Sequence, residues 1–195
     1  NLIGNKSLFF AELSGWSVIF ILDVIVAIAL YYFFRSASKE ISLITATIRI
    51  VYTLILGVAI IHLFKIIPIL SINNPLSNGL IVSESYSHLL LFEKLWSIGL
   101  IVFGLHLIGL GYLSVKSKSV HWILGYLLYL GGISYTFIHT AQQLSLFNTE
   151  VISLIESILA LPMTLAEMLL AFWLIYRGFR KSSVKNYIID YGESH

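Results

Sequence analysis

Residues 8–34 constrain the fold of this chain more than any other segment. The segment is apolar for long enough to cross a bilayer, whose hydrocarbon core of roughly 30 Å needs about 20 helical residues. It nevertheless contains two acids, Glu12 and Asp23, which a helix would place on one face about three turns apart. A carboxylate near the middle of a bilayer costs about 2.5–3.5 kcal/mol on insertion scales. We therefore expect Asp23 to face protein and to have a polar partner elsewhere in the chain.

The composition is that of an integral membrane protein. Of the 195 residues, 58% are hydrophobic and 11% are charged, whereas soluble domains average about 25% charged residues. No polar stretch is long enough to fold alone, so we expect a single domain over residues 1–195, with the lipid bilayer as its main partner. The formal net charge of +2 is too small to indicate nucleic-acid binding. The absence of cysteine excludes disulfides, thiolate metal sites and a cysteine nucleophile.

Five apolar segments near or above the spanning length predict an all-α bundle of five transmembrane helices. They cover residues 8–34, 41–67, 89–113, 120–144 and 151–176. A longer loop is expected over residues 68–88 and a polar tail over residues 177–195. Glycines recur in the third and fourth segments, and small residues let membrane helices approach closely. We therefore expect these glycines to serve helix packing.

Lysine and arginine fall in alternate connections. Arg35 and Lys39 lie in the first, Lys116 and Lys118 in the third and further basic residues in the tail, while the second and fourth contain none. The positive-inside rule then predicts a multi-pass protein of the cytoplasmic (inner) membrane with a cytoplasmic C-terminus and with Asn1 on the outer side. An outer start predicts one more helix upstream, which makes six in the intact protein.

Four ionisable residues share one predicted depth. Asp23, Arg49, His106 and Glu167 lie about seven to eleven residues from the inner ends of their helices, within about one turn in height. The forked guanidinium of Arg49 could pair with both carboxylates, and His106 would supply a proton or a hydrogen bond. Two interpretations remain open. The cluster is either a structural ion-pair network that fixes helix register or a functional site, which is the default reading of intramembrane ionisable residues.

A second polar layer is predicted near the outer face. Its candidate residues are Glu12, His62, Lys65, His139 and Glu156. Side chains near a helix end can reach the interface, so a wet vestibule or a boundary is expected there. His62 and His139 match in depth, which leaves a bis-His haem open. No metal-binding, phosphate-binding or serine-nucleophile motif is present, so no metal and no cofactor are predicted, and an enzyme is disfavoured.

The sequence also resembles a known family, the bacterial multi-pass membrane proteins catalogued as domain of unknown function 4386. The resemblance rests on LDVIVAIALYYFF around Asp23, IRIVYTLILGVA around Arg49, FGLHLIGLGYLSVKS around His106, ILGYLLYLGGISY, and LPMTLAEMLLAFWLIYRGF around Glu167. One departure is Ala166, where the family tends to have glycine. The resemblance implies the fold, the membrane location and an additional upstream helix, but no activity.

Three functions remain open from the sequence. The leading one is a non-enzymatic bundle that acts as an accessory subunit of a larger membrane complex or as a binding protein. The first alternative is a small proton-linked transporter or solute-binding protein that uses Asp23, Arg49, His106 and Glu167. The second is an intramembrane enzyme or a haem protein.

Overall fold

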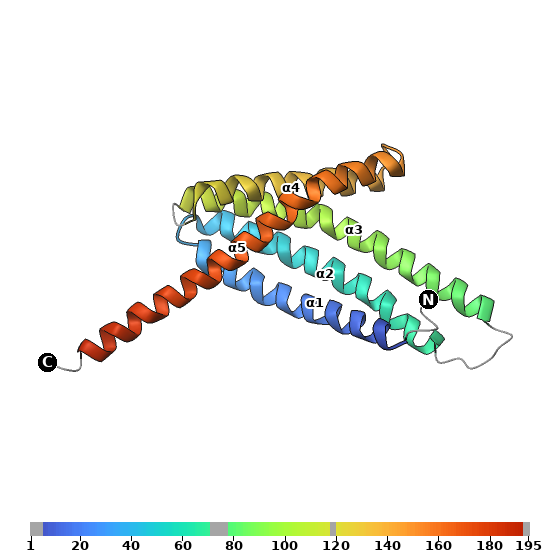
Figure 1. Ribbon diagram of the computed structural model, residues 1–195, viewed down its shortest axis with the longest axis horizontal. Coiled ribbons are helices and arrows are strands. Elements are labelled where there is room, and N and C mark those ends of the chain that lie inside the picture. The colour runs from blue at the N-terminus through green and yellow to red at the C-terminus, as the bar shows by residue number, and fades with distance from the viewer. Residues whose placement is uncertain (1–5, 71–77, 118–119, 193–195) are drawn as a thin grey trace.

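The computed structural model describes residues 6–70, 78–117 and 120–192, and these residues form an all-α bundle (Figure 1). The helices are α1 (Lys6–Phe34), α2 (Lys39–Leu70), α3 (Asn78–Ser117), α4 (Trp122–Gln143) and α5 (Thr149–Gly192). The predicted fold class is therefore confirmed. Asn1 and Lys118 lie outside the described residues.

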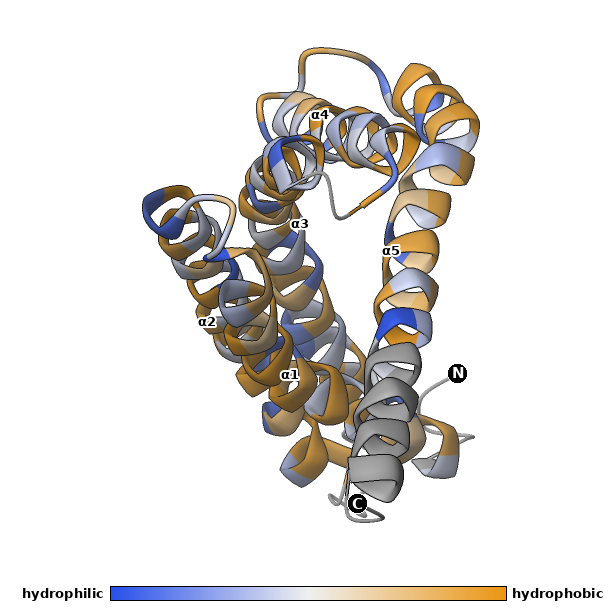
Figure 2. Cartoon of the chain, turned by 90° about the vertical axis from the view of Figure 1, so that its left-hand side faces the viewer, coloured by the Kyte–Doolittle hydropathy of each residue, from blue (hydrophilic) through white to orange (hydrophobic). Residues whose placement is uncertain are grey.

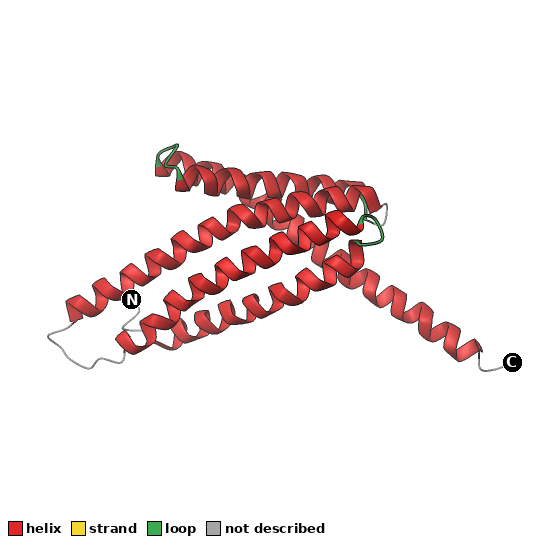
Figure 3. Cartoon of the chain, turned by 180° about the vertical axis from the view of Figure 1, so that it is seen from behind, coloured by secondary structure: helices red, strands yellow, loops and turns green. Residues whose placement is uncertain are grey.

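Helices α1, α2 and α3 lie side by side as one antiparallel layer, and α4 runs along α3 (Figure 1). Helix α5 crosses this layer diagonally and extends beyond it. Seen along the bundle, α5 stands opposite α1 and α2, with α4 joining the two sides (Figure 2). The turn between α1 and α2 lies at the same end of the bundle as the start of α4, and the α4–α5 turn lies at the other end (Figure 3).

Two helices are longer than the apolar segments that predicted them. Helix α3 begins at Asn78, so most of the loop expected over residues 68–88 is helical, apart from residues 71–77, which are outside the described residues. Helix α5 continues to Gly192, through most of the tail expected from residue 177. Hydropathy detects only the part of a helix that suits lipid, whereas backbone hydrogen bonding continues into polar sequence.

Within the described ranges, four helices are long and apolar enough to cross a membrane. These spans are Ser7–Phe34, Lys39–Leu70, Gly79–Ser117 and Thr149–Gly178. Helix α4, the fifth predicted span, is not among them, and its last two turns carry His139, Gln142 and Gln143. Large apolar side chains cover the outward faces, and Ile21, Leu54 and Leu161 are more than half exposed. Such apolar surface suits contact with lipid.

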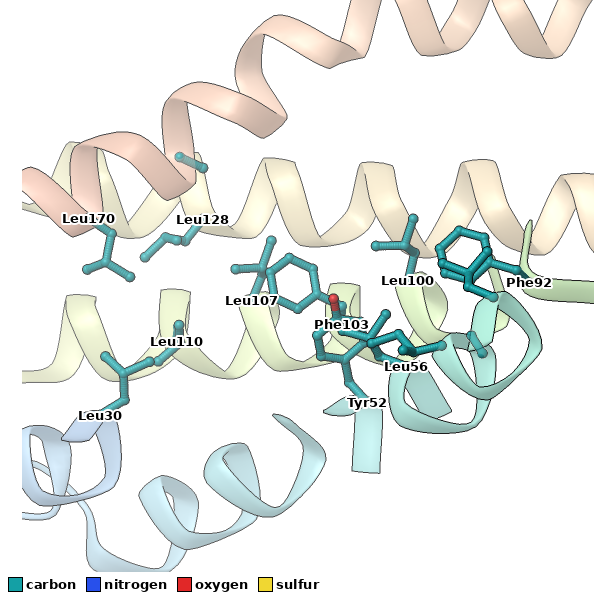
Figure 4. Close-up of a cluster of buried hydrophobic side chains, with 14 of the residues drawn as sticks. Leu30, Tyr52, Leu56, Phe92, Leu100, Phe103, Leu107, Leu110, Leu128 and Leu170 are labelled. Carbon is teal, nitrogen blue, oxygen red and sulfur yellow. The ribbon is translucent and has the colours of Figure 1, made fainter. Parts of the chain in front are cut away.

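The hydrophobic core lies between α1, α2, α3 and α4 (Figure 4). Leu56 of α2 and Leu128 of α4 are fully buried, and Phe103 and Leu107 of α3 lie between them. Leu170 brings α5 into the same cluster.

Glycine pairs bring α3 and α4 together. A Cβ atom at Gly132 would collide with the Gly104 carbonyl, and one at Gly111 would meet the Gly125 carbonyl at 2.9 Å. The pairs are two turns apart on each helix, so the two backbones touch along a seam. The predicted packing role of these glycines is confirmed, because lipid offers no hydrophobic drive and close backbone contact supplies the attraction.

Candidate functional site

Arg49 of α2 joins α1 to α3. Its Nη2 donates to Asp23 Oδ1 in an ion pair, and its Nη1 lies 3.2 Å from Nε2 of His106. The side chains of Arg49 and Asp23 are 13% and 8% exposed, and His106 is fully buried. The structure thus brings together three of the four residues that share the predicted inner depth.

The hydrogen bonds of His106 fix its protonation. Its Nδ1 lies 2.9 Å from the carbonyl oxygen of Thr45. A carbonyl can only accept, so Nδ1 carries the proton and Nε2 keeps the lone pair that accepts from Arg49. His106 is therefore neutral, and it holds one arm of the guanidinium while Asp23 holds the other.

A close approach of α2 and α3 puts the Thr45 carbonyl in place. Thr45 is buried against Gly109, where any Cβ would collide with the threonine side chain. Gly109 lies one turn after His106 on α3, so the same contact presents the carbonyl to the imidazole. The sequence interpretation missed Thr45, although a small residue one turn from a buried histidine is a signal for such an approach.

Two polar atoms of this group have no hydrogen-bond partner within the described structure. They are Asp23 Oδ2 and Arg49 Nε, and both are buried. The guanidinium carbon of Arg49 lies 5.5 Å from the centre of the Phe103 ring, which offers its negative face to the cation. The guanidinium of Arg49 is thus held between Asp23, His106 and the ring of Phe103.

Glu167 of α5 stands apart from this group. Its Oε1 accepts a hydrogen bond of 2.9 Å from the Tyr135 hydroxyl of α4. Among the described residues Arg49 forms an ion pair with Asp23 and not with Glu167, so the predicted pairing with both carboxylates is wrong. Arg49 and Glu167 lie on helices that are not neighbours, because α5 packs on α4 and not on α2 in the described part of the chain.

A cavity of about 490 Å³ occupies the space between the α1–α3 layer and α5. Its two ionisable lining residues are Arg49 and Glu167. The rest of the lining is mostly apolar and includes Val26, Leu30, Phe103, Leu107, Leu110 and Leu174. A cavity of this size, apolar with a few polar groups, has the character of a small-molecule site.

Two contacts hold α5 across the cavity. Ala166 is fully buried, and its Cβ would lie 3.4 Å from a Cβ built on Gly131 of α4. This is the position where the sequence departs from the glycine of the resembled family. At the other side, the rings of Phe33 in α1 and Trp173 in α5 meet edge to face with their centres 5.5 Å apart. Side chains thus join α5 to α1.

The residues of the predicted outer layer do not form one group. His62 Nδ1 lies 3.2 Å from His88 Nδ1 of α3, whereas His139 Nδ1 lies 3.1 Å from Ser97 Oγ. The two histidines that match in depth therefore have different partners. His88 and Ser97 were missed, since His88 falls in the expected loop and serine gives no distinctive signal.

The remaining outer residues are exposed, namely Glu12, Lys65 and Glu156. In the described ranges, no group of three histidine, aspartate or glutamate side chains could hold a metal ion.

Comparisons with known proteins show which family the sequence matches. The sequence matches the family described as "Domain of unknown function (DUF4386)" over residues 1–178. A protein of the archaeon Archaeoglobus fulgidus, described as an uncharacterized protein, is 32% identical over 170 residues, which cover 87% of this chain and 85% of that protein. No solved structure matches.

Proposed function

The chain belongs to the DUF4386 family, and we propose that it is a non-enzymatic membrane protein that binds a small amphipathic molecule in the cavity between α1–α3 and α5. The cavity carries this proposal. Its volume of about 490 Å³ falls within the range of roughly 300–1,000 Å³ that is typical of small-molecule sites. Its walls are apolar, with ionisable groups at Arg49 and Glu167.

The direction of the helices supports a multi-pass arrangement. Helices α3 and α5 run the same way through the bundle, so α4 has to return the chain between them (Figure 3). The contact of α4 with both neighbours would shield its polar groups from lipid. We therefore propose that α4 is a fifth crossing.

The basic residues support an orientation. Arg35 and Lys39 flank the α1–α2 turn, and Lys116 lies in the last turn of α3, at the same end of the bundle. By the positive-inside rule this end faces the cytoplasm, together with the C-terminal part of α5. We propose the cytoplasmic membrane as the location.

In this proposal Asp23, Arg49 and His106 form a preorganised part of the wall of the binding cavity. Asp23 and His106 each hold one terminal nitrogen of Arg49, so the guanidinium keeps one position beside the cavity. A wall that is already in place costs less reorganisation when a ligand arrives.

Proton-linked transport is the second candidate, and one observation favours it. Glu167 has no ion-pair partner within the described structure, and it lies on the helix that contains Pro162. Proline removes a backbone hydrogen bond and weakens the helix there. Glu167 follows Pro162 in the sequence of α5. If its carboxylate gains and loses a proton, the change in charge could be coupled to a movement of α5 about the proline.

Native mass spectrometry of the protein, extracted gently from its own membrane, tests the binding function. We expect an added mass of small-molecule size in the wild type and its loss in Ala171→Trp, because Ala171 lines the cavity and the indole would fill it. A bare chain in both proteins would contradict the proposal. Added mass of protein size would instead favour an accessory subunit.

A further inference from the structure

We infer that the occupant of the cavity is an organic cation, an amine or quaternary ammonium on an apolar body, and that Glu167 is its counter-ion. The inference rests on the proposed binding function and specifies its ligand class. It is argued from the charges around the cavity, from the positions of their partners and from the nature of the walls.

The charges of the ionisable groups around the cavity do not cancel. Asp23 and Arg49 form an ion pair, which cancels one negative and one positive charge. His106 is neutral, as its bond to the Thr45 carbonyl requires. Glu167 is left with a hydrogen bond from the neutral Tyr135 hydroxyl and with no cation within 4.0 Å among the described side chains. An ionised Glu167 therefore leaves one negative charge at the cavity.

An anionic ligand fits this arrangement poorly. Both terminal nitrogens of Arg49 already have partners, Asp23 and His106. Each terminal nitrogen keeps one further N–H and Nε has no partner within the described structure, but the positive charge of the guanidinium is already compensated by Asp23. An anion in the cavity would thus meet the Glu167 carboxylate beside a guanidinium whose charge Asp23 already compensates, and like charges in an apolar setting repel strongly.

A cationic ligand fits both the charge and the walls. Its positive group would pair with Glu167, and its apolar body would lie against the aliphatic side chains of α1, α3 and α5. Against mostly apolar walls, the pairing of two opposite charges is stronger than at a fully solvated surface.

Two probes of the same shape and opposite charge separate these possibilities. Tetraphenylphosphonium is a cation and tetraphenylborate an anion of similar size. Binding of each is measured by equilibrium dialysis against the purified full chain in detergent. We expect wild-type protein to prefer the cation, and Glu167→Gln to weaken cation binding by about tenfold or more, the effect of losing about 1.4 kcal/mol.

Control variants make the result specific. Glu156→Gln makes the same change about three turns earlier on α5, at an exposed position, and should bind like the wild type. Glu167→Asp keeps the charge and should retain much of the cation preference. It also serves as the informative variant if Glu167→Gln does not fold.

The outcomes distinguish a failure of the cation assignment from a failure of the proposed binding function. If Ala171→Trp abolishes binding while Glu167→Gln leaves the affinity and the cation preference unchanged, the cavity binds ligands but the charge assignment is overturned. A preference for tetraphenylborate would overturn it as well. If Ala171→Trp changes nothing, the cavity is not the binding site, and the proposed function fails together with the inference.

Discussion

Gly109 of α3 lies directly against Thr45 of α2, without room for a methyl group between them. This contact places the Thr45 carbonyl 2.9 Å from Nδ1 of His106. The imidazole in turn accepts from Arg49 through Nε2. Gly109 has no functional side chain, yet its contact with Thr45 sets the geometry of Arg49 and His106.

The first prediction concerns this contact. Gly109→Ala should separate α2 from α3 and lengthen the bond between Thr45 and His106. We expect a destabilisation of about 1–3 kcal/mol, as for overpacking in a tight core. Thermal unfolding in detergent measures it. Gly15→Ala is the matched control, since nothing lies within 4 Å of that position. An equal effect of both substitutions would show that the contact does not matter.

The second prediction concerns the ion pair. Arg49→Leu leaves the Asp23 carboxylate buried without its partner and should cost about 3–5 kcal/mol. The double variant Asp23→Leu with Arg49→Leu removes both charges and should recover much of that loss. Denaturant unfolding of the two single variants and the double variant gives the coupling energy. Wild-type stability in Arg49→Leu would mean that Arg49 is solvated rather than paired.

The third prediction concerns His106. Replacement by leucine removes the donor to Thr45 and the acceptor for Arg49, and the buried atoms left behind should cost about 1–3 kcal/mol. Glutamine carries both a donor and an acceptor, so His106→Gln should be less destabilised than His106→Leu. Differential scanning fluorimetry ranks the variants. The reverse order would contradict a hydrogen-bonding role.

The fourth prediction compares two adjacent glycines of α4. A Cβ at Gly132 collides with the backbone of α3, whereas one at Gly131 meets Ala166 of α5 at 3.4 Å, an ordinary contact. Gly132→Ala should therefore lower the melting temperature. Gly131→Ala should leave it unchanged or raise it, because alanine favours a helix by up to about 1 kcal/mol. Similar melting temperatures for the two variants would argue against the glycine seam.

The shared depth of Asp23, Arg49 and His106 in the bundle could be predicted from the sequence. Which helices stand beside one another at that depth could not. A rise of about 1.5 Å per residue converts position in a helix into height, which is why Asp23, Arg49 and His106 were expected to share a depth. The same arithmetic placed Glu167 at that height. It carries no information about which helix stands beside which, and α5 packs on α4 at a distance from Arg49.

Residues with ordinary side chains escaped prediction for a related reason. Thr45 acts through its backbone carbonyl, which every residue possesses, so its type gives no indication of the role. Tyr135 was one of several tyrosines, and its contact with Glu167 depends on the angle between α4 and α5. Charge inside an apolar segment is conspicuous in a sequence, whereas the neutral partners that hold it emerge from packing.

The order of the helix contacts has a consequence for how the protein is made. In the described part of the chain each helix packs mainly on its neighbours in sequence, apart from minor contacts of α1 with α3 and, through Phe33 and Trp173, with α5. Contacts that are local in sequence form early, and a chain of this kind can assemble in the order in which the ribosome delivers it. Among the described helices α5 follows the other four in sequence, and the cavity has its α5 wall only after that helix has packed. The packing of α5 would then also be the step at which a ligand first meets the complete site.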